Sequence, residues 1–176
     1  MAPSKAVLLM AYGSPNTLDE VEPYYRDIRG GRTPTEEQVE ELTERYRRVG
    51  GRTPLLEITR AVAKALERRL GVTGNGRYKV YVGMKHWHPF IADTVPLIAV
   101  DGVQRLIAIP MAPHYSQMSI DGYRNEVEEA IHALAHPIPT RFIESWHGNP
   151  LYISMVAQKV QEAMKGFGQP TSAQVE

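Results

Sequence analysis

The chain has 176 residues, which is enough for one domain that buries about 70% of the surface of the unfolded chain. Basic and acidic residues both number 20, so the net charge is zero, and this argues against a nucleic-acid partner. The absence of cysteine excludes disulfides, iron–sulfur clusters and cysteine-bound zinc within the chain, and it fits a reducing compartment. No apolar run reaches the roughly 18–20 residues of a membrane span, and no signal-peptide pattern is present, so we expect a cytoplasmic protein.

The first apolar run, at about residues 5–11, predicts a buried strand. A polar stretch rich in glycine and proline follows it and holds three expected helical segments before the next strand. The expected helix ends are Thr17 with Glu20 at capping-box spacing for the first segment, Thr35 with Gln38 for the segment 35–49, and Pro54 and Gly71 for the segment 54–70.

From residue 78 onward, strand and helix patterns alternate. Strands are expected at about 78–83, 104–110 and 140–144, and helices at about 89–100, 121–134 and 150–165, with Pro96 inside the first helix of these and Ser119 as the N-cap of the second. Strands that alternate with helices indicate βαβ units. We therefore predict one α/β domain over residues 1–176: an open four-stranded parallel sheet, doubly wound with helices on both faces, and a helical insertion after the first strand.

Ring-bearing residues follow each of the four predicted strands. Because parallel strands end at the same edge of a sheet, these residues are expected along one edge, where open α/β sheets bind their ligands. They are Tyr12 after the first strand, His86, Trp87 and His88 after the second, His114 and Tyr115 after the third, and Trp146 and His147 after the fourth.

Tyr12 precedes the turn Gly13-Ser14-Pro15, which matches neither the dinucleotide fingerprint nor a P-loop. A tyrosine between a strand and a glycine turn can place its hydroxyl in a cleft, as a metal ligand or a hydrogen-bond donor. It can equally be a packing residue with a hydrated hydroxyl. The residue type leaves both interpretations open.

The histidines allow similar alternatives. His86 and His88 alternate around Trp87, so in an extended segment they point to one side and form a conceivable metal pair, or else they are the polar ends of a helix start. His114 is either a cleft residue or a buried, hydrogen-bonded one.

Arginines are concentrated in the insertion, around the glycine pairs 30–31 and 50–51. They suit carboxylate recognition through paired hydrogen bonds, or they simply solvate a surface. These residues are Arg29, Arg32, Arg45, Arg47, Arg48 and Arg52.

Taken together, these motifs resemble the N-terminal half of ferrochelatase, of the coproporphyrin type found in many bacteria. The family is a group of lyases that insert ferrous iron into a porphyrin held between two similar α/β domains. The matching segments agree in order and spacing over nearly the whole chain, and they cover residues 8–15, 24–32, 45–55, 83–91, 112–116 and 144–146.

The resemblance implies a chelatase-like, flavodoxin-like fold and a porphyrin site in haem biosynthesis. It implies that Tyr12 faces the porphyrin and can be an axial ligand of the metal. It further implies porphyrin contacts from Arg29, Arg45, Tyr46, Thr53, His86 and Tyr123. Iron and the porphyrin, coproporphyrin III or protoporphyrin IX, are then substrates, and no cofactor is required.

Two positions depart from the family pattern. Thr53 stands where the family usually has serine, which keeps a hydroxyl. Gly30 stands where many relatives have a second arginine, which weakens carboxylate recognition unless Arg32 replaces it.

The proton-abstracting histidine of the family lies in an Ala-His-Ser-Leu-Pro segment, and its glutamate partner lies further on. Neither matches a position in residues 1–176, so we assign no catalytic residue to this chain. We expect a domain that is incomplete alone and that works with a C-terminal half. The alternatives are a homodimeric half-size chelatase and a non-catalytic porphyrin- or haem-binding module.

Overall fold

The computed structural model describes residues 5–73 and 78–167, without the side chain of residue 73. The chain forms two compact units, Met1–Glu144 and Ser145–Glu176. Among the described residues, the first unit holds the sheet and most of the helices, and the second holds one helix. The single domain predicted over residues 1–176 stays a prediction.

The first unit is built on a four-stranded sheet in which all strands are parallel. Its order is β2 (Tyr78–Met84), β1 (Lys5–Ala11), β3 (Arg105–Pro110) and β4 (Thr140–Phe142). This order matches the first four strands of a flavodoxin-like sheet and confirms the predicted fold class. β1 is central and almost wholly buried, as its continuous apolar sequence requires in a parallel sheet.

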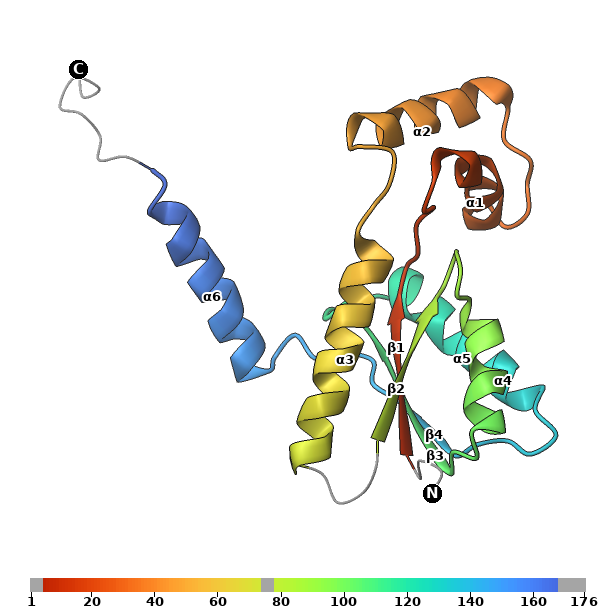
Figure 1. The fold of residues 1–176 in the computed structure, drawn as a ribbon, viewed down its shortest axis with the longest axis vertical. Coiled ribbons are helices and arrows are strands. Elements are labelled where there is room, and N and C mark those ends of the chain that lie inside the picture. Colours follow the sequence, from red (N-terminus) through yellow and green to blue (C-terminus); the bar gives the residue numbers. More distant parts are fainter. Residues whose placement is uncertain (1–4, 74–77, 168–176) are drawn as a thin grey trace. The chain divides into compact units, whose positions relative to one another are not determined.

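Helices cover both faces of this sheet. Figure 1 shows α3 (Leu55–Thr73) on one face, and α4 (Ile91–Val100) and α5 (Gly122–His132) on the other. The main core lies between the sheet and the α4–α5 pair. Its fully buried members include Leu8, Met10, Ile91, Val95, Ile98, Leu106 and Val127. α4 is continuous although Pro96 lies inside it.

The predicted helical insertion is present between β1 and α3. It comprises a 3-10 turn, η1 (Leu18–Glu20), followed by α1 (Val21–Ile28) and α2 (Glu36–Arg48). In Figure 1, α1 and α2 lie beyond the carboxyl ends of β1 and β2. The insertion therefore sits at the edge of the sheet where the ring-bearing residues were predicted.

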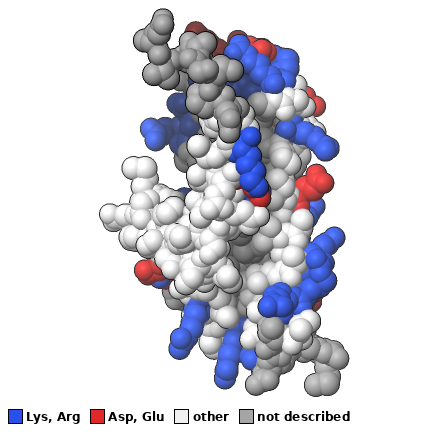
Figure 2. Space-filling model, turned by 90° about the vertical axis from the view of Figure 1, so that its left-hand side faces the viewer, with Lys and Arg blue, Asp and Glu red and all other residues white. Residues whose placement is uncertain are grey.

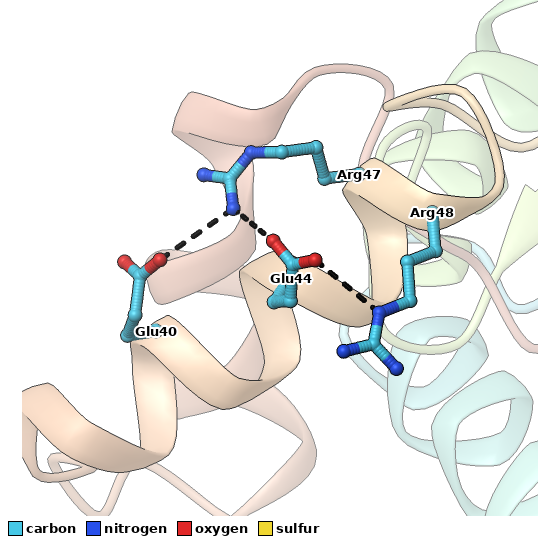
Figure 3. A network of polar contacts seen from close by, with 4 residues as sticks. All are labelled: Glu40, Glu44, Arg47 and Arg48. Atoms are coloured by element: carbon cyan, nitrogen blue, oxygen red, sulfur yellow. Dashed lines mark hydrogen bonds and ion pairs between the residues drawn. The ribbon is translucent and has the colours of Figure 1, made fainter.

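α2 is a highly charged helix. Its start has the predicted capping box, in which Thr35 and Gln38 each bind the backbone N–H of the other. Figure 3 shows its surface network: Glu44 binds both Arg47 and Arg48, and Arg47 also lies 3.5 Å from Glu40. The two arginines lower the pKa of the Glu44 carboxyl. Because these groups are exposed, their pairing is weakened by salt.

Two predicted helix ends were wrong, and a third lacks the predicted side-chain capping bond. Thr17 is the N-cap residue of η1, as predicted, but its side chain makes no capping bond, and the Glu20 carboxylate accepts from the backbone N–H of Asn16 at 2.6 Å. α3 runs past Gly71 to Thr73, because glycine ends a helix only where the chain turns. The hydroxyl that caps at the start of α5 belongs to Ser116, which accepts from the N–H of Ser119 in a π-type turn, η2 (Gln117–Asp121).

The second unit contains α6 (Pro150–Met164). The side chain of Asn149 caps it by accepting from the N–H of Leu151 at 2.9 Å, and Pro150 occupies the first turn. The Trp146 ring packs edge-on against Tyr152 with 5.2 Å between centroids. These two features fix the start of the helix predicted at 150–165.

Charged groups are distributed widely. Figure 2 shows Lys and Arg side chains at several separate places on the face drawn, with Asp and Glu side chains beside some of them. Within residues 5–73 and 78–167, no helix combines the length and the apolar character that a membrane crossing needs.

Candidate porphyrin site

The candidate site begins where β1 and β2 end. Two backbone hydrogen bonds continue the pairing of the strands past their ends, from the N–H of Lys85 to Ala11 O at 2.9 Å and from the N–H of His86 to Tyr12 O at 2.8 Å. The rings of Tyr12 and His86 pack with 4.5 Å between centroids and a tilt of 57°. Tyr12 is 48% exposed, so one side of its ring packs on the protein while the other stays open to a ligand.

The turn after Tyr12 fits closely against the second strand end. Gly13 has a φ of +95°, and a Cβ added to it would lie 2.8 Å from the backbone nitrogen of Trp87. Only glycine meets both conditions without strain. The hydroxyl of Tyr24 lies 3.5 Å from the Gly13 carbonyl oxygen. The direction in which Tyr12 leaves the sheet is therefore set by this turn.

Trp87 joins the strand end to the insertion. It is buried, its indole N–H donates to the Glu20 carboxylate at 2.8 Å, and its ring packs edge-on against Tyr24 at 6.1 Å. The same carboxylate accepts from Asn16. These hydrogen bonds help to hold the pKa of Glu20 below its usual value, against the effect of burial.

His86 is fixed from the other side by Asp27 of α1, whose carboxylate lies 2.8 Å from the imidazole Nδ1. Burial lowers the pKa of His86, and the bond to Asp27 opposes that shift. A neutral imidazole that donates from Nδ1 leaves Nε2 as an acceptor. Asp27 was missed in the sequence, because it is 59 residues from His86 and no local pattern relates the two.

Three further tyrosines surround Tyr12. Burial raises the pKa of Tyr24, Tyr46 and Tyr123, and the phenol of Tyr12 is near enough to raise each of them further. The Tyr24 and Tyr46 rings pack edge-on at 6.4 Å. The structure thus brings together Tyr12, Tyr46 and Tyr123, three of the positions that the sequence placed around a porphyrin.

The predicted arginines behave differently from one another. Arg29, at the end of α1, lies with its guanidinium 5.3 Å from the ring centroid of Tyr25, and its buried Nε has no hydrogen-bond partner among the described residues. Arg32 donates to the Arg29 carbonyl oxygen at 3.2 Å. Arg45 lies along α2 and pairs with Glu41 at 2.5 Å, with 68% of its side chain exposed. Arg29 is therefore the arginine whose hydrogen-bonding capacity is incompletely used, whereas Arg45 must leave Glu41 to reach a ligand.

Thr53 lies in the connection between α2 and α3. Its hydroxyl makes a short contact with the hydroxyl of Ser14 in the turn after β1. This contact ties the insertion to the sheet edge, and it is a contact that either threonine or serine can make.

The remaining histidines form no metal centre with their neighbours. His88 is exposed and packs on Trp87 and Phe90, and His114 is exposed. Within the described part of the chain, no group of three or more histidine, aspartate and glutamate residues is arranged to hold a metal ion.

A cavity of about 830 Å³ lies beside the His86–Asp27 pair, and Lys85, Phe90 and Glu126 are among the residues that line it. Burial raises the pKa of Glu126 to about 7, while Lys85 opposes the shift and Asp27 adds to it. The Lys85 ammonium lies 5.5 Å from the ring centroid of Tyr123. Lys85 and Glu126 were not singled out in the sequence, because single charged residues carry no local signal.

The geometry defines an α/β domain of the chelatase-like class, with a half-exposed tyrosine, buried phenols and an arginine around one end of a parallel sheet. The family model described as Ferrochelatase matches residues 4–175. The chain therefore belongs to the ferrochelatase family, as the sequence motifs had indicated.

Individual relatives support the same family assignment. The chain is 46% identical over 167 residues to the ferrochelatase of Herpetosiphon aurantiacus, covering 95% of this chain and 55% of that protein. It is 42% identical to the ferrochelatase of Thermus thermophilus, covering 95% of this chain and 57% of the relative. It is 41% identical to the coproporphyrin III ferrochelatase of Halalkalibacterium halodurans, covering 90% of this chain and 51% of that relative. The chain thus spans about half the length of the curated relatives that it matches.

Proposed function

We propose that this chain supplies one wall of a porphyrin site at which ferrous iron is inserted into coproporphyrin III or protoporphyrin IX. The observation that carries the proposal is the position of Tyr12: it is half exposed at the end of the central strand, packed on His86 and surrounded by other phenols. Membership of the ferrochelatase family supports it, as does the similarity to a coproporphyrin III ferrochelatase.

Each residue has a role that follows from its chemistry. The Tyr12 oxygen points to the iron as an axial ligand, and the partly exposed ring of Tyr46 gives apolar surface to the macrocycle. Tyr123 is buried in the core, so it supports the site by packing. The Arg29 guanidinium recognises a propionate carboxylate, which would supply the hydrogen bonds that its surroundings leave incomplete. Thr53 holds the turn after β1 in place through Ser14, and Arg45 binds a second carboxylate after it leaves Glu41.

Proton removal from the pyrrole nitrogens needs a positioned base. We propose that this base comes from the region that the relatives have in addition to the part matched here, or from a second copy of this chain. Iron and porphyrin are the substrates in this proposal, and no further cofactor is required. We place the reaction in the cytoplasm, which the absence of cysteine supports.

A titration with coproporphyrin III tests the binding role. The porphyrin absorption band should shift and saturate on addition of the chain. Arg29→Ala should weaken binding about 10-fold or more, because a buried charge-assisted hydrogen bond is lost. Arg48→Ala is the matched control, since 75% of the Arg48 side chain is exposed and it pairs with Glu44 on the surface. The absence of any shift at high micromolar protein would refute the proposal.

An iron-insertion assay separates this function from that of a porphyrin or haem carrier. A ferrochelatase wall should support metalation of free porphyrin once the complementary half is added or the chain dimerises. A carrier would bind haem through Tyr12 and leave free porphyrin without iron under every one of these conditions.

A further inference from the structure

Three residues from different parts of the first unit form a continuous set of contacts that ends at Tyr12. Asp27 comes from α1, His86 from the end of β2, and Tyr12 from the end of β1. Asp27 lies 2.8 Å from His86 Nδ1, and the His86 ring lies 4.5 Å from the Tyr12 ring. The His86 side chain is 16% exposed, whereas that of Asp27 is 38% exposed.

Tyr12 needs support from its neighbours to point in one direction. Its backbone is fixed by the bond from the His86 N–H to the Tyr12 carbonyl oxygen at 2.8 Å, but a half-exposed phenol still rotates about its χ angles. The tilted His86 ring restricts this rotation on one side. A histidine ring can itself rotate, and the hydrogen bond to Asp27 holds it in a single orientation.

We propose that Asp27 is a positioning residue for the iron-facing tyrosine: through its hydrogen bond to His86 Nδ1, it holds the imidazole against Tyr12 and so fixes the direction of the Tyr12 hydroxyl. This inference rests on the proposed function for its use, since the hydroxyl is what the iron would meet. The positioning itself is a property of the ligand-free chain. It depends on the hydrogen bond and not on the charge of Asp27, which faces Lys85 and Glu126 across the adjacent cavity.

The first experiment needs no ligand. In NMR spectra of the full chain with labelled tyrosine and histidine, the Tyr12 and His86 rings should give mutual cross-peaks. Asp27→Ala should weaken or abolish them, whereas Asp27→Asn should retain them because the amide oxygen still accepts from Nδ1. Glu22→Ala is the control on the same helix, since Glu22 pairs with Arg26 at the surface. Unchanged cross-peaks in a folded Asp27→Ala variant would overturn the proposal.

The second experiment measures the consequence for the ligand. Ferric coproporphyrin bound to the chain should show the absorption of a tyrosinate-ligated iron, and Tyr12→Phe should remove it. Asp27→Ala should weaken binding of the ferric form about 10- to 100-fold, as loss of an outer-shell partner does at metal sites. Binding of metal-free porphyrin should change less than about twofold. Asp27→Asn should restore the ferric affinity.

The outcomes separate the two claims. If the wild-type chain binds no porphyrin, the proposed function fails, and the NMR comparison still decides the positioning role. If Asp27→Ala weakens ferric binding equally in a His86→Ala background, the effect does not pass through His86 and the positioning role is refuted. A loss shared equally by ferric and metal-free porphyrin would refute it as well.

Discussion

Replacing Gly13 by alanine tests whether the turn after Tyr12 is held as tightly as its geometry indicates. An alanine at a φ of +95° costs about 1–2 kcal/mol in backbone conformation. Its Cβ would also lie 2.8 Å from the Trp87 backbone nitrogen, an atom that cannot rotate away, and such overpacking costs about 1–3 kcal/mol. The two effects together predict a loss of about 2–5 kcal/mol, or a fall in Tm of about 4–20 °C at 2–4 °C per kcal/mol for a chain of this size.

Gly31→Ala is the matched control. Gly31 has a φ of +85°, but a Cβ there would meet no atom within 4 Å, so only the backbone cost of about 1–2 kcal/mol applies. Thermal and urea unfolding, followed by circular dichroism, gives both values. If Gly13→Ala loses no more stability than Gly31→Ala, the Trp87 segment is not a rigid wall, and the explanation given for the direction of Tyr12 is wrong.

Three other substitutions test separate parts of the structure. Thr35→Ala should lower stability by about 1 kcal/mol in urea unfolding, because the bond to the Gln38 N–H is lost, while Thr35→Ser should retain it. Leu8→Ala should cost about 2–5 kcal/mol, since Leu8 is fully buried, whereas Leu97→Ala at a 61% exposed position should change stability by less than about 0.5 kcal/mol. Because the folded pKa of Glu126 is raised from 4.5 to about 7, the contribution of Glu126 to wild-type stability should fall as pH rises from 4.5 to 7. Glu126→Gln should remove that part of the pH dependence, so the variant should be the more stable protein at pH 8 and equal to the wild type below pH 4; identical pH profiles would contradict the assigned burial.

The fold was largely predictable because its signals are local. Short runs rich in apolar residues predicted all four strands, and the parallel arrangement of the strands places Tyr12 beside His86 at one edge. Helix ends were less predictable because several side chains compete for the same backbone N–H groups. Thr17 is the N-cap residue as predicted, yet its side chain makes no capping bond, and the Glu20 carboxylate bonds Asn16.

The site was predictable in its position but not in its contacts. The resemblance to a family supplied Tyr46 and Tyr123, which lie near Tyr12, but it gave no indication of Asp27, which reaches His86 from 59 residues away. Arg45 shows a different problem. Its position in the chain is the expected one, but its side chain pairs with Glu41, a neighbour one helical turn away, and no sequence pattern decides between that partner and a ligand.

The contacts between the insertion and the sheet edge have a consequence for where the chain tolerates a change of length. Glu20 with Trp87, Asp27 with His86, and Thr53 with Ser14 attach the insertion at three points. An added residue within 14–27 would move two of these attachments out of register. The loop around Gly30 and Gly31 lies between attachments, and a side chain added at either glycine would meet no atom within 4 Å. Natural length variation, linkers and reporter peptides should therefore be accommodated in that loop with the least effect on the rest of the domain.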